Sequence, residues 1–273
     1  PVVPYAYRKD TEVFSRHWEA LLVKKKRYSR QKFFNEVMAR SHDSGTKPVT
    51  YQEVRKCCLN DDSIWSPPGE GIKTGTVWAG VDWGTGEGSY TIISFWGYDK
   101  NGRFSLIYAK RYEGAESDPE FSVKDIINLC RHYNVKRVGC DWGFGFYTNA
   151  QIRKSIGQDK VLLYQHSGGQ KDKVKWDKSG MKFVTHRARV LQDIFTIIKK
   201  GPNPKGVVFP KWEIMETFAQ DILSVYSEYS ESRRQIVFNH PRGNPDDFLH
   251  TMCYAFLASQ FDVRRPEFYT PGT

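Results

Sequence analysis

The order of strand-like and helix-like segments after Thr76 constrains the fold of this chain most strongly. The first segments are β-rich, and two of them meet at Asn101-Gly102, a dipeptide typical of hairpin turns. Later strand-like segments alternate with segments of helical periodicity. The expected elements are strands at 77–83, 90–98, 104–112, 135–140 and 161–164, helices at 119–133 and near 149–156, 186–200, 211–226 and 245–261, and a hairpin at 227–239. Three antiparallel strands that lead into parallel strands through crossover helices predict an α/β fold, a mixed sheet flanked by helices.

The first 75 residues have a different texture. Residues 10–40 are mostly helical in pattern, and a second short helical stretch covers 50–59. The loop at 60–75 is rich in Pro, Gly, Asp and Ser and is the expected boundary. We therefore expect an N-terminal helical and linker segment at 1–75 and an α/β domain at 76–273.

Composition decides which classes of protein are disfavoured. Hydrophobic residues make up 39% of the chain and aromatic residues 15%, an amount that a disordered chain would not carry. No apolar run approaches the ~20 residues that span a bilayer, and the N-terminus does not resemble a signal peptide, so we expect no membrane association and no secretion. The five Cys lack C-x-x-C spacing, which disfavours a zinc site or a disulfide framework. The net charge of +10 favours a polyanionic partner such as nucleic acid.

Acidic residues stand at three places where a strand ends or a helix begins. Asp82 and Asp141 each follow an apolar strand, and Asp246 and Asp247 open the last helix. Taken singly, each has a structural explanation, because Asp before Trp-Gly forms turns and acids in a first helical turn complement the helix dipole. If the first and fourth strands are adjacent and parallel, however, Asp82 and Asp141 stand side by side. The last helix can then bring its carboxylates to the same edge, and the residues leave open which of the two points there.

Such a cluster of carboxylates predicts a metal site. Two carboxylates ~4 Å apart repel by about 4 kcal/mol at an effective dielectric of 20, so a cluster of them needs counter-charge. Mg²⁺ and Mn²⁺ prefer all-oxygen ligands, and two such ions about 3.5–4 Å apart promote phosphodiester cleavage. His166, His186 and His240 lack metal-ligand spacing and are expected to be structural or on the surface.

A basic segment is the second candidate binding feature. Residues 165–189 hold seven Lys or Arg against two Asp, with Trp176 and Phe183 interleaved. A glycine-bearing basic loop beside an acidic cluster is typical of a surface that contacts backbone phosphates, although a solvated surface loop would explain it too. The residues expected to contact DNA are Lys171, Lys173, Lys175, Lys178 and Arg187.

Together these residues resemble the ribonuclease H-like nuclease domain of the large terminase subunit of tailed bacteriophages. The resemblance rests on Asp82 and Asp141 at strand ends and on Asp246-Asp247 before the apolar TMCYAFLA. It also rests on FFNEVMARSHDSG at 33–45, which is similar to the Phe-x-x-Glu stretch that precedes this nuclease.

The resemblance implies a metal-dependent DNA endonuclease that cuts concatemeric viral DNA during genome packaging, in the cytoplasm of the infected bacterial host. Asp82, Asp141 and Asp247 would be its catalytic metal ligands. Asp246 would support or share that role, and His250 would assist the ligands. The implied cofactors are two Mg²⁺ or Mn²⁺ ions, and the implied partners are double-stranded DNA, a packaging ATPase domain, a portal and a small terminase subunit.

The chain also departs from this family, and other classes of function stay open. Such terminases carry a G-x-x-x-x-G-K-[ST] phosphate loop, which GEGIKTGT at 69–76 does not match, and the extra acid of some members is replaced by Gly88 beside Glu87. The VDWGTG and CDWGFG segments resemble the phosphate loops of actin-like or sugar-kinase-like ATPases. A non-catalytic DNA-binding module would use the same acids as turn and cap residues only.

Overall fold

The computed structural model describes residues 18–25, 37, 47–60, 63–84, 89–143, 145–169, 171–231, 235–241 and 243–263. The chain divides into two compact units, Pro1–Lys47 and Pro48–Thr273. In the first unit residues 18–25 form a helix, which agrees with the helical pattern over 10–40. The segment at 33–45 that contributes to the family resemblance lies outside the described residues, apart from Val37.

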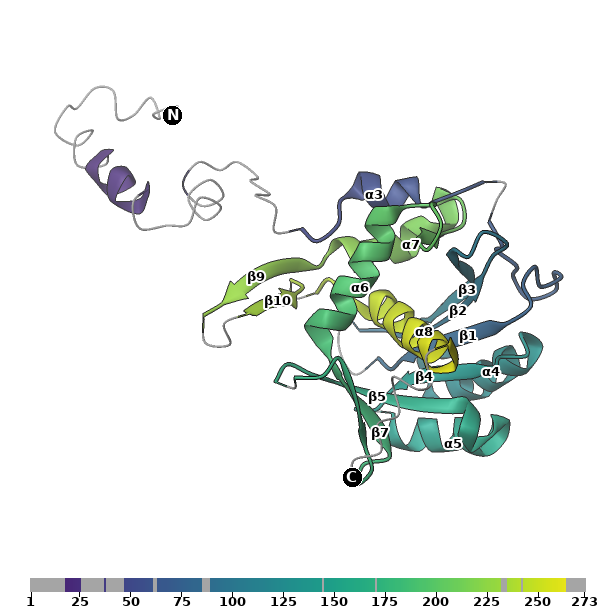
Figure 1. The fold of residues 1–273 in the computed structure, drawn as a ribbon. Helices are drawn as coiled ribbons and strands as arrows, with labels where there is room; N and C mark the ends of the chain where they lie inside the picture. The colour runs from purple at the N-terminus through teal and green to yellow at the C-terminus, as the bar shows by residue number, and fades with distance from the viewer. Residues whose placement is uncertain are drawn as a thin grey trace. The chain divides into compact units, whose positions relative to one another are not determined.

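The second unit is built on an eight-stranded mixed sheet of order β6-β7-β5-β4-β1-β2-β3-β8 (Figure 1). β1, β2 and β3 pair antiparallel, and β4, β5 and β7 continue from β1 in parallel. At the two edges β6 pairs antiparallel with β7, and β8 pairs in parallel with β3. The strands are β1 (Val77–Asp82), β2 (Thr91–Tyr98), β3 (Phe104–Tyr112), β4 (Arg137–Asp141), β5 (Val161–Ser167), β6 (Val174–Asp177), β7 (Lys182–His186) and β8 (Val207–Val208). This arrangement confirms the predicted mixed-sheet α/β fold.

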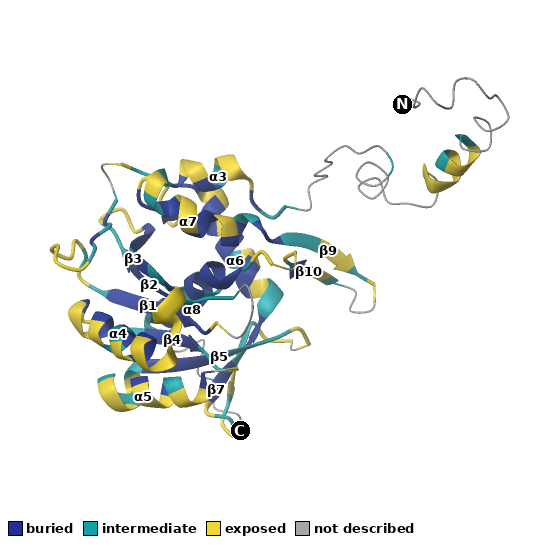
Figure 2. Cartoon of the chain, turned by 180° about the vertical axis from the view of Figure 1, so that it is seen from behind, coloured by how far each residue is buried: buried dark blue, intermediate teal, exposed yellow. Residues whose placement is uncertain are grey.

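Helices cover both faces of the sheet. On one face lies α8 (Asp247–Val263), backed by α6 (Arg187–Lys200) and α7 (Trp212–Leu223). The other face is covered by α4 (Pro119–His132) and α5 (Phe146–Ile156). Because helices shield both faces, every residue of β1 is buried, and Figure 2 shows exposed residues on the outward turns of α4 and α5. None of the helices described has both the length and the hydropathy needed to cross a lipid bilayer.

The residues just before the sheet belong to this same unit, so the compact domain begins at Pro48 and the expected boundary at 75–76 lies inside it. The helix α3 (Tyr51–Lys56) packs against α6 and α7. The Pro-rich and Gly-rich loop that follows is fixed to the sheet, since the Ser66 N–H donates to the Ile107 carbonyl at 2.8 Å. The Pro-rich and Gly-rich composition of residues 60–75 thus indicates a loop, but this loop is part of the compact domain and not a linker before it.

Both predicted hairpins are present. The Asn101-Gly102 turn joins β2 to β3, and Gly102 adopts a φ of 69°, a left-handed conformation that glycine favours. The second hairpin consists of β9 (Tyr226–Ser230) and β10 (Gln235–Asn239), which form a separate two-stranded sheet. The remaining short elements are η3 (Gly114–Ser117) and η4 (Gln158–Lys160).

The basic segment at 165–189 is not the loop that we expected. It contains the end of β5 and the antiparallel pair β6–β7, which extends the sheet at one edge. Trp176 lies opposite Phe183 in this pair, with ring centroids 4.8 Å apart. A cross-strand aromatic pair of this kind stabilises a hairpin, so the aromatic residues among the lysines explain why the segment becomes sheet.

Candidate active site

Asp82 and Asp141 end two neighbouring strands. β1 and β4 are parallel, and their register pairs Val81 with Cys140, so the next residue on each strand is one of the two aspartates. The carboxyl ends of parallel strands meet at one edge of a sheet. The predicted juxtaposition of these two acids is therefore present.

Two glycines allow α8 to lie directly on these strands. A Cβ atom on Gly80 would stand 1.8 Å from the Thr251 carbonyl oxygen, and one on Gly139 would stand 2.4 Å from the Tyr254 carbonyl oxygen. Any larger residue at either position would therefore push α8 away from the sheet. The close approach brings the acidic start of α8 to the edge where β1 and β4 end.

The four carboxylates of Asp82, Asp141, Asp246 and Asp247 share one electrostatic environment, and we call them the acidic centre. Asp82 is only 9% exposed. Burial raises the pKa of Asp82 well above its ordinary value, and the charges of the other three acids raise it further, against the opposing effect of His250. Three of these four acids are thus buried, and their mutual repulsion disfavours the charged form of Asp82.

Asp246 is neutralised by cationic groups of the protein. Its Oδ2 atom accepts a hydrogen bond from Arg187 Nη2 at 2.7 Å and lies 3.2 Å from His250 Nε2, and His240 Nε2 lies 3.6 Å from its Oδ1 atom. Burial alone would raise the pKa of Asp246, but His250 and Arg187 hold it below its usual range. Although burial disfavours the imidazolium, Asp246 and Asp82 raise the pKa of His250 to about 9. Asp246 and its partners therefore form a nearly balanced charge cluster.

Asp247 has neutral partners instead. Its Oδ2 atom accepts from the Tyr90 N–H at 2.6 Å, and its Oδ1 atom accepts from Ser89 Oγ at 3.2 Å. Burial raises the pKa of Asp247, the two hydrogen bonds lower it, and the charge of Asp246 raises it. Asp247 therefore differs from its neighbour Asp246, because it forms no ion pair within the described residues.

Asp141 is oriented by a tyrosine of α8. Its Oδ1 atom accepts from the Tyr254 hydroxyl at 3.1 Å, and its Oδ2 atom accepts from the Gly143 N–H at 2.9 Å. The Tyr254 ring stacks on the His166 ring with centroids 5.3 Å apart. Burial lowers the pKa of His166 well below its ordinary value, so this imidazole is a neutral packing partner. The tyrosine thus joins the helix to the strand-end carboxylate.

A buried ion pair caps the helix that carries the acids. Asp221 of α7 accepts from the Phe248 N–H at 2.9 Å through Oδ2 and from Arg111 Nη2 at 3.0 Å through Oδ1. A carboxylate at a helix N-terminus satisfies an unpaired N–H and complements the helix dipole. Burial raises the pKa of Asp221 to about 6, although the Phe248 N–H and Arg111 oppose this effect. Asp221 therefore fixes the start of α8 from a neighbouring helix.

The donor chemistry of the acidic centre suits a hard divalent cation. Its ligands would be carboxylate oxygens, which Mg²⁺ and Mn²⁺ prefer, and the raised pKa of Asp82 marks a position where a cation is favourable. Among the residues that the structure describes, no three His, Cys, Asp or Glu side chains are close enough to share one ion. In this structure the carboxylate oxygens of Asp141 and Asp247 accept hydrogen bonds from protein donors.

The basic residues divide into two groups. Lys171, Lys175 and Lys178 are exposed on or beside the β6–β7 hairpin, whereas Lys173 Nζ pairs with Asp193 Oδ2 at 2.5 Å. Arg187, by contrast, is bonded to Asp246 within the acidic centre. The lysines are thus placed for contact with a polyanion, while the guanidinium of Arg187 is already paired. A DNA contact by any of these residues stays a prediction.

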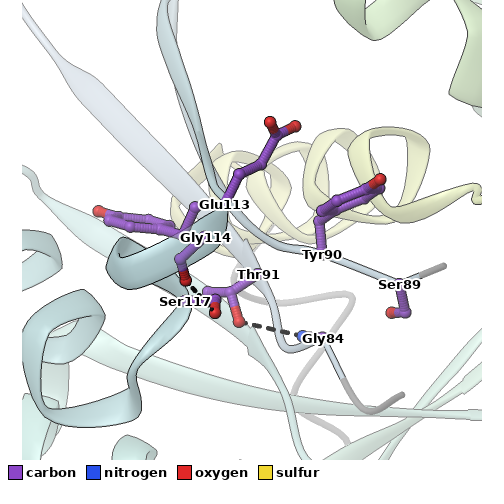
Figure 3. A pocket seen from close by; sticks show the side chains of 8 residues that line it. Gly84, Ser89, Tyr90, Thr91, Glu113, Gly114 and Ser117 are labelled. Carbon is purple, nitrogen blue, oxygen red and sulfur yellow. Dashed lines mark hydrogen bonds between the residues drawn. The ribbon is translucent and has the colours of Figure 1, made fainter. Parts of the chain in front are cut away.

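A cavity of about 290 Å³ adjoins the acidic centre (Figure 3). It lies between the end of β1, the start of β2 and η3. Its lining residues are Gly84, Ser89, Tyr90, Thr91, Tyr112, Glu113, Gly114 and Ser117. Because Ser89 and Tyr90 also donate to Asp247, this cavity and the carboxylate share one wall.

Several supporting residues are not evident from the sequence. Ser89 and Asp221 reach the site through tertiary packing, which no local pattern reveals. Tyr254 carries a signal, since it lies seven residues after Asp247 and thus on the same side of the helix. His240, expected to be structural or on the surface, is within 3.6 Å of Asp246 because β10 leads directly into the start of α8.

Solved structures of two bacteriophage large terminases share this fold. The nuclease domain of the large terminase subunit gp2 of bacterial virus Sf6 aligns with a TM-score of 0.52 and 12% identity over 76% of this chain and 97% of that domain. The HK97 bacteriophage large terminase aligns with a TM-score of 0.50 and 10% identity over 78% of this chain, and the match spans 43% of that protein. No family model and no curated protein matches the sequence. The chain therefore has the ribonuclease H-like fold of terminase nuclease domains, as the sequence resemblance predicts.

Proposed function

We propose that this chain is a metal-dependent DNA endonuclease that cuts concatemeric viral DNA during genome packaging. The observation that carries the proposal is the burial of Asp82 within the field of three further carboxylates, which raises its pKa well above the ordinary value. Buried carboxylates with strongly shifted pKa values cluster at functional sites, and a bound cation would offset their repulsion. The fold shared with terminase nuclease domains supports the same conclusion.

Asp82, Asp141 and Asp247 are the proposed metal ligands. When bound, two Mg²⁺ or Mn²⁺ ions would activate a water molecule and stabilise the leaving oxygen of the phosphodiester. Ser89 and the Tyr90 N–H hold Asp247 in place, and Tyr254 holds Asp141. Asp246 is proposed to act indirectly, because Arg187 and His250 occupy its oxygens.

The proposed substrate is double-stranded DNA, which the net charge of +10 would attract. The exposed lysines of the β6–β7 hairpin are proposed to contact its phosphates. The proposed partners are a packaging ATPase domain, a portal and a small terminase subunit, and the proposed place of action is the cytoplasm of an infected bacterium.

A plasmid assay tests the activity directly. Supercoiled plasmid is incubated with the protein and Mn²⁺, Mg²⁺ or EDTA, beside Asp82→Asn and the control Asp159→Asn. Asp159 is an exposed residue at the opposite end of the sheet. We expect metal-dependent nicking that falls roughly a thousandfold in Asp82→Asn, since losing a ligand removes several kcal/mol and each 1.36 kcal/mol is tenfold in rate. Nicking in EDTA, or full activity of Asp82→Asn, would refute the proposal, and wild-type protein without activity in either metal would favour a non-catalytic DNA-binding module.

A further inference from the structure

We infer that Phe146 and Tyr147 form an aromatic platform that stacks against an unstacked base of the DNA beside the acidic centre. This inference rests on the proposed nuclease function and adds a contact that recognises bases rather than phosphates. It concerns the start of α5, which follows the loop after Asp141.

The exposure of the two rings is the first observation. Phe146 is 72% exposed and Tyr147 is 80% exposed, more than any other large hydrophobic side chain in the described part of the chain. The rings lie edge to face with centroids 5.5 Å apart. Single exposed aromatic residues are common, but two adjacent ones whose rings contact each other and stay exposed indicate a surface for a partner.

The platform is held rigidly relative to the acids. Asn149, one turn into α5 and only 2% exposed, accepts from Trp83 Nε1 at 3.0 Å and donates to the Asp141 carbonyl at 2.8 Å. Trp83 directly follows Asp82, so one side chain joins α5 to the neighbourhood of both strand-end carboxylates. Gly145 strengthens this attachment, because a Cβ atom there would stand 2.3 Å from Trp83 Nε1. A base on the platform would therefore have a fixed position relative to the cleavage chemistry.

Positive charge beside the platform identifies a nucleic acid as its partner. Lys182 Nζ lies 3.3 Å from the centroid of the Trp142 ring, so the end of the β6–β7 turn contacts the loop that leads into α5. Lys182 itself is buried and pairs with Asp177, so the exposed charge of this turn is that of Lys178. Aromatic rings next to cations are the combination that binds unpaired nucleotides, since bases stack on the rings and phosphates meet the charges. In an intact duplex both faces of each base are covered, so the platform would act where the strand is opened or unstacked.

A binding experiment in EDTA tests the platform separately from cleavage. Fluorescence anisotropy of the full chain is measured with a labelled duplex that contains a central unpaired bubble and with a fully paired duplex of equal length. We expect the double variant Phe146→Ala, Tyr147→Ala to bind the bubble at least about tenfold more weakly, the loss typical of one stacked base, and the paired duplex within about twofold of wild type. The salt dependence should not change, because no charge is removed.

Two further variants make the result specific. Phe146→Tyr combined with Tyr147→Phe should retain wild-type binding, because both rings remain. Tyr51→Ala removes an aromatic residue that is 47% exposed on α3, far from α5 in both views, and should not alter bubble binding (Figures 1 and 2). The inference would be overturned if the double alanine variant bound the bubble duplex as tightly as wild type, or if it bound both DNAs more weakly by the same factor. It would also be overturned if the wild-type protein bound neither DNA. Failure of the nuclease proposal would appear instead as absent plasmid cleavage with the bubble preference intact.

Discussion

The acidic centre and the β6–β7 hairpin carry opposite charges in opposite surroundings. Asp82, Asp246 and Asp247 are each at most 9% exposed, and specific hydrogen bonds or ion pairs hold Asp246 and Asp247. On the hairpin, Lys175 and Lys178 are exposed. Buried charges interact strongly with specific neighbours, whereas exposed charges are screened by salt over about 10 Å.

Single substitutions should therefore act differently in these two regions. In the acidic centre a single Asp→Asn substitution changes the charge balance of the whole cluster. The effects of such substitutions should therefore be large and should differ from one aspartate to the next. On the hairpin each lysine adds a similar, salt-dependent amount, so its effects should be modest and additive. The predictions below test this contrast.

The largest effect should come from substituting Asp247 and Asp246 one at a time. We expect Asp247→Asn to reduce plasmid cleavage roughly a thousandfold without lowering the melting temperature in EDTA, because it removes an uncompensated negative charge. Asp246→Asn should instead lower the free energy of unfolding by about 3 kcal/mol, because Arg187 and His250 lose their counter-charge. Nicking assays and thermal unfolding at pH 7.5 measure the two effects.

The opposite pattern would assign the roles the other way round. If Asp246→Asn abolished cleavage and left stability intact, while Asp247→Asn lowered the melting temperature, Asp246 would be the ligand. If both variants lost the same cleavage activity and the same stability, only the summed charge of the acidic centre would matter. The acidic centre would then not differ from the hairpin in how it responds to substitution.

Much of this contrast could be predicted from the sequence, because it follows from strand ends and helix starts. Asp82 and Asp141 end apolar strands, so the parallel pairing of β1 and β4 alone brings them together. Gly80 and Gly139 were not recognised, since the need for glycine arises only when α8 crosses the sheet at contact distance. The basic segment reads as a loop in the sequence because its lysines mask the alternating pattern of a strand, and the structure shows the β6–β7 pair there. The opposite environments of Asp246 and Asp247 depend on Arg187 and Tyr90, whose positions are set by tertiary packing.

A smaller effect should follow from removing hairpin charge. The double variant Lys175→Ala, Lys178→Ala should bind duplex DNA roughly tenfold more weakly near 0.1 M salt. If each lysine neutralises one phosphate, the negative slope of log K against log salt should become smaller in magnitude by about 1.8. The matched control is Lys199→Ala, Lys200→Ala, which removes two exposed lysines from the far end of α6. An equal change in both variants would indicate non-specific attraction by the net charge and would remove the hairpin from the binding surface.

An effect on stability alone should be the pH dependence that Asp221 confers. Burial first of all raises the pKa of this carboxyl to about 6, so the folded protein binds its proton more tightly than the unfolded chain does. Stability from this group is therefore fully present below about pH 4 and is lost as the pH rises to about 6, at no more than about 1.4 kcal/mol per pH unit.

In Asp221→Asn this loss should vanish, so the stability difference between wild type and variant should change between pH 4 and 6 and stay constant above. Urea unfolding at several pH values measures it, with Asp159→Asn as an exposed control. The proposal would be wrong if the difference in free energy of unfolding between wild type and Asp221→Asn did not change with pH, or changed as it does for Asp159→Asn. Burial beside Arg111 and the Phe248 N–H would then not shift the pKa of Asp221, and burial would not distinguish the acids of this region from exposed charges.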